Sequence, residues 1–163
     1  MLVIFSNKSR TYVLNNNLSA QNSVIVVGMG NNTKDATSGV DTRVNFGAEL
    51  ISDTDTYSLN STYGSIQVKQ TGTYRIQAQV GMAVNSTGYR QIRIKRGDSY
   101  DTASTLAIQT IMATTTATPV SIERITTLNA GQFIFIDVNQ SSGTTLAIST
   151  GSGYTFASVT RLK

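Results

Sequence analysis

The stretch IQVKQTGTYRIQAQVGM, residues Ile66–Met82, indicates the fold class. In its second half, apolar and polar side chains alternate, with Tyr74, Ile76, Ala78 and Val80 on one face and Arg75, Gln77 and Gln79 on the other. A period of two is typical of a strand with one buried face. Gly72 supplies the backbone freedom of a tight connection, so the stretch predicts a hairpin of two strands joined at Gln70–Gly72.

The same pattern recurs along the chain, and helical periodicity is almost absent. We expect strands at Thr11–Leu14, Ser23–Val27, Arg43–Leu50, Ser65–Lys69, Thr73–Val84, Tyr89–Lys95, Thr105–Met112, Val120–Leu128, Phe133–Asn139, Thr145–Ser149 and Thr155–Arg161. Gly-, Asn- and Asp-rich turns separate them. Many short strands at this spacing predict an all-β sandwich, jelly roll or barrel.

The composition excludes several kinds of chemistry. The 163 residues include no cysteine and no histidine, which removes disulfides, thiolate metal sites and histidine-based catalytic triads. Only 13% of the residues are charged, against about 25% in typical soluble domains. The polar surface must therefore consist mostly of Thr, Ser, Asn, Gln and Gly. We predict that the protein is not an enzyme and needs no cofactor.

The N-terminal part reads as a separate segment. Residues Met29–Val40, MGNNTKDATSGV, are the most loop-like of the chain, so we expect an arm over residues 1–40 and a main domain over residues 41–163. The arm should mediate attachment, and residues up to about Asn31 should be dispensable for folding. The apolar run Leu2–Phe5 is too short for a signal peptide or a membrane span, and we expect no membrane insertion.

Two strands near the C-terminus are apolar on both faces. Phe133 and Phe135 alternate with Ile134, Ile136 and Val138, and Tyr154 and Phe156 alternate with Ala157 and Val159 on the terminal strand. Either such a strand lies centrally in the fold, or a second subunit covers its other face. Aromatic side chains on a face that a monomer would leave wet favour self-association.

The order of several segments resembles that of a known family. They are Val44–Phe46, Tyr57, Gly64–Val68, Gly72–Ile76, Tyr89–Ile94, Ile125–Leu128, Ala130–Gly131, Phe133–Val138 and Gly153–Leu162. Together they resemble the C1q/tumour-necrosis-factor-like jelly-roll family from about Arg43 onward. Gln132 departs from the pattern, because the family usually has Asp there. The cysteine-free, Asn- and Thr-rich, weakly charged style is similar to C1q-like modules of bacteria and tailed bacteriophages.

The resemblance implies a ten-stranded jelly roll that assembles as a compact trimer and binds or builds structures without catalysis. It places the two doubly apolar strands side by side near the threefold axis. We therefore expect Phe133, Phe135, Tyr154 and Phe156 to contribute to an aromatic trimer interface or core.

A local basic cluster comprises Arg90, Arg93, Lys95 and Arg96 in the segment YRQIRIKRG. Ile92 and Ile94 point inward on this strand, so Arg93 and Lys95 share the outward face. The cluster is either a solvated strand face or a contact for an acidic partner or an anionic glycan. The net charge is +4 and the isoelectric point about 9.5, but the basic residues are dispersed, and we expect no nucleic-acid partner.

Asp53 and Asp55 lie on one side of an extended segment, and Asp137 and Asn139 have the same spacing. Such pairs can bind Ca²⁺, whereas aspartates in turns more often cap their own backbone. No pair lies in an aromatic, apolar context, which argues against a glycosidase, and we predict no metal site.

These observations predict a structural virion protein of a tailed phage, a trimeric decoration (cement or head-fibre) protein on the capsid. Its partners would be its own copies and a capsid or tail protein, and it would reside on the virion surface after synthesis in the host cytoplasm. One alternative is the receptor-binding head of a tail tip or fibre that recognises a host surface saccharide. The other is a bacterial C1q-like surface adhesin.

Overall fold

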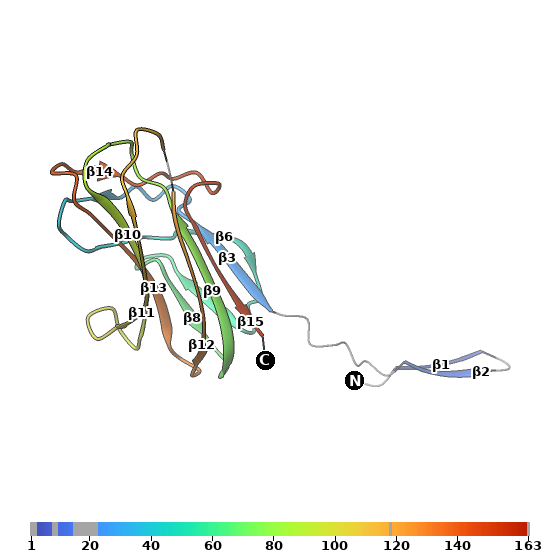
Figure 1. Ribbon diagram of the computed structural model, residues 1–163. Helices are drawn as coiled ribbons and strands as arrows, with labels where there is room; N and C mark the ends of the chain where they lie inside the picture. Colours follow the sequence, from blue (N-terminus) through green and yellow to red (C-terminus); the bar gives the residue numbers. More distant parts are fainter. Residues whose placement is uncertain (1–2, 8–9, 15–22, 118, 163) are drawn as a thin grey trace.

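The computed structural model describes residues 3–7, 10–14, 23–117 and 119–162, the first two ranges as backbone only (Figure 1). The strands are β1 Val3–Asn7, β2 Arg10–Leu14, β3 Val24–Gly28, β4 Asp35–Ala36, β5 Thr42–Arg43, β6 Ala48–Ser52, β7 Tyr57–Asn60, β8 Ser65–Val68, β9 Gly72–Val80, β10 Tyr89–Gly97, β11 Ser104–Met112, β12 Val120–Leu128, β13 Phe133–Gln140, β14 Leu146–Ala147 and β15 Phe156–Arg161. Within the described part of the chain, no helical segment has the length and hydropathy of a membrane span.

Two antiparallel sheets face each other and form a jelly-roll sandwich (Figure 1). One sheet has the order β11-β10-β13-β8-β7, with β5 added beside β13, and the other has the order β12-β9-β15-β3-β6. The two main paths hold the ten strands that the resemblance implied, which confirms the predicted all-β fold class. We call them the six-stranded and the five-stranded sheet.

The core lies between the two sheets. The tyrosine rings of β7 and β9, Tyr57 and Tyr74, are fully buried and meet edge to face with their centroids 6.1 Å apart. The Tyr57 hydroxyl donates a hydrogen bond to the main-chain oxygen of Ser23 at 2.8 Å, and burial raises the pKa of Tyr57 to about 12. A buried phenol thus fixes the start of β3 against the opposite sheet.

The segment Ile66–Met82 folds as two strands with the predicted faces, but these strands do not form a hairpin. The backbone of β8 pairs with β7 and β13, whereas β9 pairs with β12 and β15. The connection at Gln70–Gly72 therefore crosses from one sheet to the other. Both strands direct apolar side chains into the same core. An alternating sequence identifies the buried face of a strand, but it does not identify the neighbouring strand with which that strand pairs.

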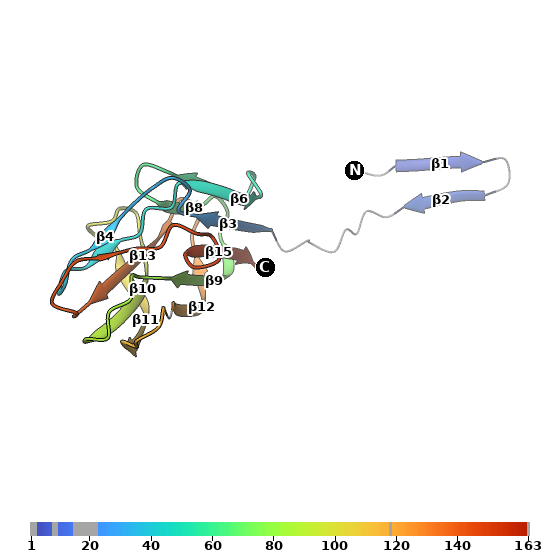
Figure 2. The same cartoon turned by 90° about the horizontal axis from the view of Figure 1, so that it is seen from above.

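The predicted boundary at residue 40 is wrong, because β3 belongs to the sandwich. β3 lies between β15 and β6 in the five-stranded sheet, and Ile25 and Val27 are completely buried. β4 also pairs with β14 near the other end of the chain. Upstream, β1 and β2 pair with each other as a hairpin and join neither sandwich sheet (Figure 2). The sandwich therefore begins by Val24, and the hairpin of β1 and β2 lies outside it.

One turn glycine gives a test of the packing. Gly64 joins β7 to β8 with φ at +62°, and a Cβ there would lie 2.5 Å from the Asn45 Cα and the Phe46 nitrogen. Gly143 has a similar φ of +80° with no atom within 4 Å of such a Cβ. Left-handed backbone costs an alanine about 1–2 kcal/mol at either position, but only Gly64→Ala also forces the backbone apart.

We therefore expect Gly64→Ala to lower the free energy of unfolding by at least ~2 kcal/mol more than Gly143→Ala, measured by urea denaturation. Equal losses in the two variants would show that residues 45–46 can move away from the turn at little cost.

Candidate binding surface on the six-stranded sheet

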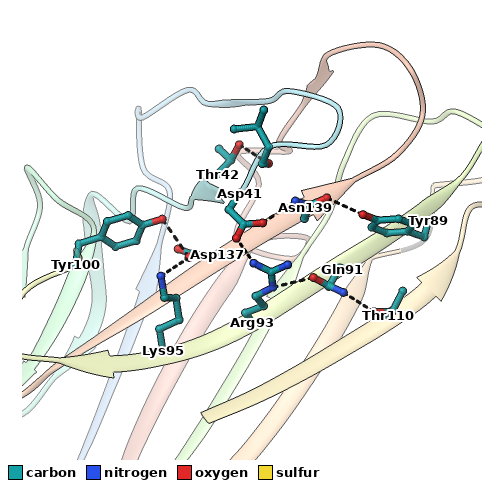
Figure 3. Close-up of polar contacts among 11 residues, drawn as sticks. Asp41, Thr42, Tyr89, Gln91, Arg93, Lys95, Tyr100, Thr110, Asp137 and Asn139 are labelled. Atoms are coloured by element: carbon teal, nitrogen blue, oxygen red, sulfur yellow. Dashed lines mark hydrogen bonds and ion pairs between the residues drawn. The ribbon is translucent and has the colours of Figure 1, made fainter. Parts of the chain in front are cut away.

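The outer face of the six-stranded sheet holds a polar network centred on β10 and β13 (Figure 3). Alternation along β10 buries Ile92 and Ile94 and directs Arg93 and Lys95 outward, as the sequence predicted. The two cations meet carboxylates from other segments: Arg93 pairs with Asp41, and Lys95 pairs with Asp137 on the neighbouring strand β13.

Asp41 joins residues of two neighbouring strands, β10 and β13. One of its carboxylate oxygens accepts from Arg93, and the other accepts from the Asn139 amide at 2.6 Å. The Tyr89 hydroxyl in turn donates to the Asn139 side-chain oxygen at 3.0 Å. On the other side, Arg93 Nε donates to the Gln91 amide oxygen at 2.7 Å. Each polar side chain in this network holds the next in place.

Asp137 is the buried carboxylate of the surface. Its side chain is fully buried, and one oxygen lies 3.3 Å from Lys95 Nζ and accepts from the Tyr100 hydroxyl at 3.1 Å. The other oxygen has no hydrogen-bond partner in the described part of the chain. Burial raises the pKa of Asp137 above its usual value, and the Lys95 ammonium opposes that rise. Burial, with the Asp137 carboxylate adding to it, also raises the pKa of Tyr100 to about 12.

Beside this network, aromatic rings surround a cation. Phe133 and Phe135 stack with their centroids 6.2 Å apart, and Tyr100 meets Phe135 edge to face at 5.5 Å. The Arg43 guanidinium carbon lies 4.6 Å from the Tyr100 ring centroid and 5.3 Å from that of Tyr63. Ring faces attract a cation at these distances. Arg43 Nε is buried without an acceptor.

These rings line a groove of about 820 Å³, here called the aromatic groove. Its lining comes from four segments: residues 34–43, Asn60–Ser65, the β10–β11 loop at residues 98–101, and Phe133 and Phe135 of β13. The first segment is anchored to β13, because Gly39 N donates to Gln140 O at 2.7 Å and Val44 N donates to Ile136 O at 2.8 Å. The groove is thus built onto a strand of the sheet.

The four predicted interface aromatics form two separate groups. Phe133 and Phe135 lie in the six-stranded sheet and line the aromatic groove. Tyr154, which is 53% exposed, precedes β15, and the half-buried Phe156 begins that strand in the five-stranded sheet. Because β13 and β15 lie in different sheets, the expectation that they run side by side is wrong. A role for any one of the four in a subunit interface stays a prediction.

The predicted basic cluster is not a free positive patch. Arg90 is buried and donates to the main-chain oxygens of Asn85, Thr87 and Tyr89, and burial lowers its pKa. Arg96 donates to Thr127 O at 3.2 Å. Arg93 and Lys95 are already paired with carboxylates of the same chain, so the cluster has less unpaired positive charge than the sequence indicated. Its contact with an acidic partner or an anionic glycan stays a prediction.

Asp53 serves as a turn cap. Its carboxylate accepts from the Asp55 nitrogen at 3.1 Å and from the Thr56 hydroxyl at 2.9 Å, and these bonds hold its pKa below the usual value. This is the local role that the turn interpretation assigned to it. No group of three or more Asp or Glu side chains in the described ranges is placed to hold a metal ion.

The outer face of the five-stranded sheet has a different character. One row crosses all five strands: Ile51, Val26, Ser158, Gln77 and Glu123. Ile51 is 57% exposed at the end of this row, and Leu50 and Ile125 are exposed to a similar degree. Glu123 pairs with Arg75 on the next strand at 2.8 Å. We call this the apolar sheet face after its exposed aliphatic side chains, which lie among the polar side chains of β15, β9 and β12.

Comparison with known proteins identifies the fold. The chain is similar to crystal structures of murine APRIL, with a TM-score of 0.69 at 15% identity over 87% of this chain and 100% of that one. The structure of Eiger TNF from S. frugiperda gives a TM-score of 0.63 at 15% identity, over 87% of this chain and 93% of that one. The fold is a TNF-like jelly roll. At such identity the likeness shows the TNF-like fold alone.

Sequence comparison gives one viral relative. An uncharacterized protein of Acanthamoeba polyphaga mimivirus, L688, is 35% identical over 92 residues, which are 55% of this chain. The matched region covers 39% of that relative's length. No known family model matches the chain.

The sequence analysis missed Arg43, Tyr63 and Tyr100 as members of a site. The available signal was weak: Tyr63 and Tyr100 are aromatic residues in connections between predicted strands, beside Gly64 and between Asp98 and Asp101. A connection between strands has no buried face of its own. An aromatic side chain there packs against a neighbouring segment or faces solvent.

Proposed function

We propose that this chain is a non-enzymatic, self-associating module on the surface of a virus particle, a trimeric decoration protein of a tailed-phage capsid. The TNF-like fold supports self-association, and the mimivirus relative supports a viral origin. The lack of histidine and cysteine throughout the chain supports a role without catalysis.

The apolar sheet face carries the proposal. Ile51 and Val26 lie opposite each other on β6 and β3, and the half-buried Phe156 lies on the adjacent strand β15. Together with the exposed Leu50 of β6, these side chains form an apolar patch on the face, and exposed apolar patches usually mark an interface. The charged groups Arg75 and Glu123 neutralise each other there, which lowers the cost of removing that face from water.

Two isoleucines of equal exposure test this interface. Ile51 is 57% exposed on the apolar sheet face, and Ile108 is 55% exposed on β11 of the six-stranded sheet. Arginine at position 51 would place three unpaired charges in a dry interface, so Ile51→Arg should weaken trimer assembly ~100-fold or more. Ile108→Arg should leave it unchanged.

Analytical ultracentrifugation and native mass spectrometry measure both variants against wild type. A wild-type chain that stays monomeric at micromolar concentration would contradict self-association. An Ile51→Arg variant that assembles like Ile108→Arg would place the interface elsewhere. Electron microscopy of intact particles, with the chain labelled, would then test the capsid position directly.

A receptor-binding head that recognises a host surface saccharide is the second candidate. The observation that favours it is the aromatic groove, which offers the exposed Tyr63 ring, two partly exposed rings and polar side chains. No comparable observation favours the bacterial adhesin, and the viral relative supports a virus protein instead.

A further inference from the structure

The aromatic groove has the composition of a ligand site, and we propose that it binds a neutral saccharide, with Tyr63 as the ring on which a sugar packs. This inference deepens the second candidate function and rests on it, but it does not depend on trimer formation. A pyranose has an apolar face of C–H groups and an edge of hydroxyl groups, so its site needs an exposed aromatic ring beside hydrogen-bonding side chains.

Tyr63 supplies the ring. It is 53% exposed, although the groove and Arg43 lie against it. Its position is fixed by the turn, because its nitrogen donates to the main-chain and side-chain oxygens of Asn60, both at 3.2 Å. A large exposed ring held by its backbone loses little conformational entropy when a ligand packs on it. The partly exposed Phe133 extends the aromatic lining of the groove.

Polar groups surround this ring. Arg43 presents a guanidinium that contacts two tyrosine rings, and its buried Nε has no acceptor among the residues that the structure describes. Asp98 and Asp101, from the β10–β11 loop, add acceptor oxygens to the lining. Sugar hydroxyls both donate and accept, so carboxylates and a guanidinium in the same lining can bind them together.

The charge of the lining favours a neutral ligand. Carboxylates outnumber cations there, with Asp35, Asp41, Asp98 and Asp101 against Lys34 and Arg43. Asp41 is already paired with Arg93, which leaves the remaining charges close to balance. A sialylated or sulfated glycan would therefore gain no net attraction. The volume of about 820 Å³ lies within the roughly 300–1,000 Å³ of small-molecule sites and suits a short oligosaccharide.

A matched pair of tyrosines tests the site. Tyr63 and Tyr154 are both 53% exposed, but only Tyr63 lines the groove. The wild-type chain is applied to a glycan array that carries neutral, sialylated and sulfated oligosaccharides. Affinity for the best-bound neutral glycan is then measured by calorimetry for Tyr63→Ala, Tyr63→Phe and Tyr154→Ala.

We expect wild type to bind neutral glycans. Tyr63→Ala should bind ~10-fold more weakly or worse, whereas Tyr63→Phe, which keeps the ring, and Tyr154→Ala should bind like wild type. Binding to no glycan, a preference for the anionic glycans, or equal losses in Tyr63→Ala and Tyr154→Ala would overturn the inference. Binding to a peptide array in place of glycans would also overturn it. The oligomeric state of each sample is measured as well. A sample that assembles but binds no glycan contradicts the saccharide site and leaves self-association intact.

Discussion

A chain that lacks residues 1–31 is expected to be unfolded, whereas a chain that lacks residues 1–20 should keep the sandwich intact. The longer deletion removes β3, whose two neighbours are β15 and β6. It also removes Ile25 and Val27 from the core and the main-chain acceptor of the Tyr57 hydroxyl. Buried aliphatic side chains contribute about 1.5–3 kcal/mol each, and domains of this size are stable by only 5–15 kcal/mol.

Circular dichroism, thermal unfolding and a proton–nitrogen NMR spectrum would compare the two deletions with the full chain. The shorter deletion is the control, because β1 and β2 pair only with each other and join neither sheet of the sandwich. A folded and cooperative protein without residues 1–31 would mean that another segment can replace β3. That result would support the arm boundary that the loop-like sequence Met29–Val40 indicated.

Replacing Lys95 by methionine should lower the free energy of unfolding by about 3–5 kcal/mol at pH 7. Methionine keeps the aliphatic volume, but it leaves the fully buried Asp137 carboxylate with the Tyr100 hydroxyl and no cation. Removing one partner of a buried ion pair is costly because the other charge stays out of water. Urea denaturation gives the loss directly.

The loss should shrink as the pH falls. The folded-state pKa of Asp137 lies above its ordinary value, so the folded protein holds the proton more tightly than the unfolded chain does. The stabilisation from protonation is complete below the unfolded pKa and disappears as the pH rises through the folded pKa. Without Lys95 the folded pKa should rise further, so Lys95→Met should recover part of its stability between pH 7 and about pH 4.

Lys69→Met is the control for this experiment, because Lys69 is exposed and donates only to the Thr54 main-chain oxygen among its described contacts. It should change stability by less than about 1 kcal/mol at either pH. Equal losses of unfolding free energy in the two lysine variants would show that the Lys95–Asp137 pair does not cause the destabilisation. A Lys95→Met loss that stays constant with pH would show that Asp137 does not take up the proton.

Sequence patterns could predict the strands and their faces, but not the pairing between strands. Alternation in Tyr74–Val80 identified the buried face of β9 correctly, yet β8 and β9 belong to different sheets. Side-chain period is a property of one strand, whereas sheet membership depends on partners far along the chain. The same reason explains the error for β13 and β15, which are both apolar on two faces but lie in opposite layers.

The candidate site was less accessible to prediction than the fold. The period of β10 correctly placed Arg93 and Lys95 outward, but nothing local to them indicates Asp41 or Asp137 as partners. The groove combines four segments that are distant in sequence, and its aromatic residues come from two turns and one strand. Such a site exists only once the sheets have formed, so no short pattern encodes it.

The position of β15 has a consequence for synthesis. This strand is the last of its sheet to leave the ribosome, yet it lies in the middle, between β9 and β3. Until residues 156–161 emerge, β9 and β3 each present a ladder edge without its neighbour, and such edges invite pairing with other chains. The nascent chain therefore completes this sheet by inserting β15 between two strands that are already made. Contacts of such long sequence separation form slowly, which makes the emerging chain a candidate for chaperone protection.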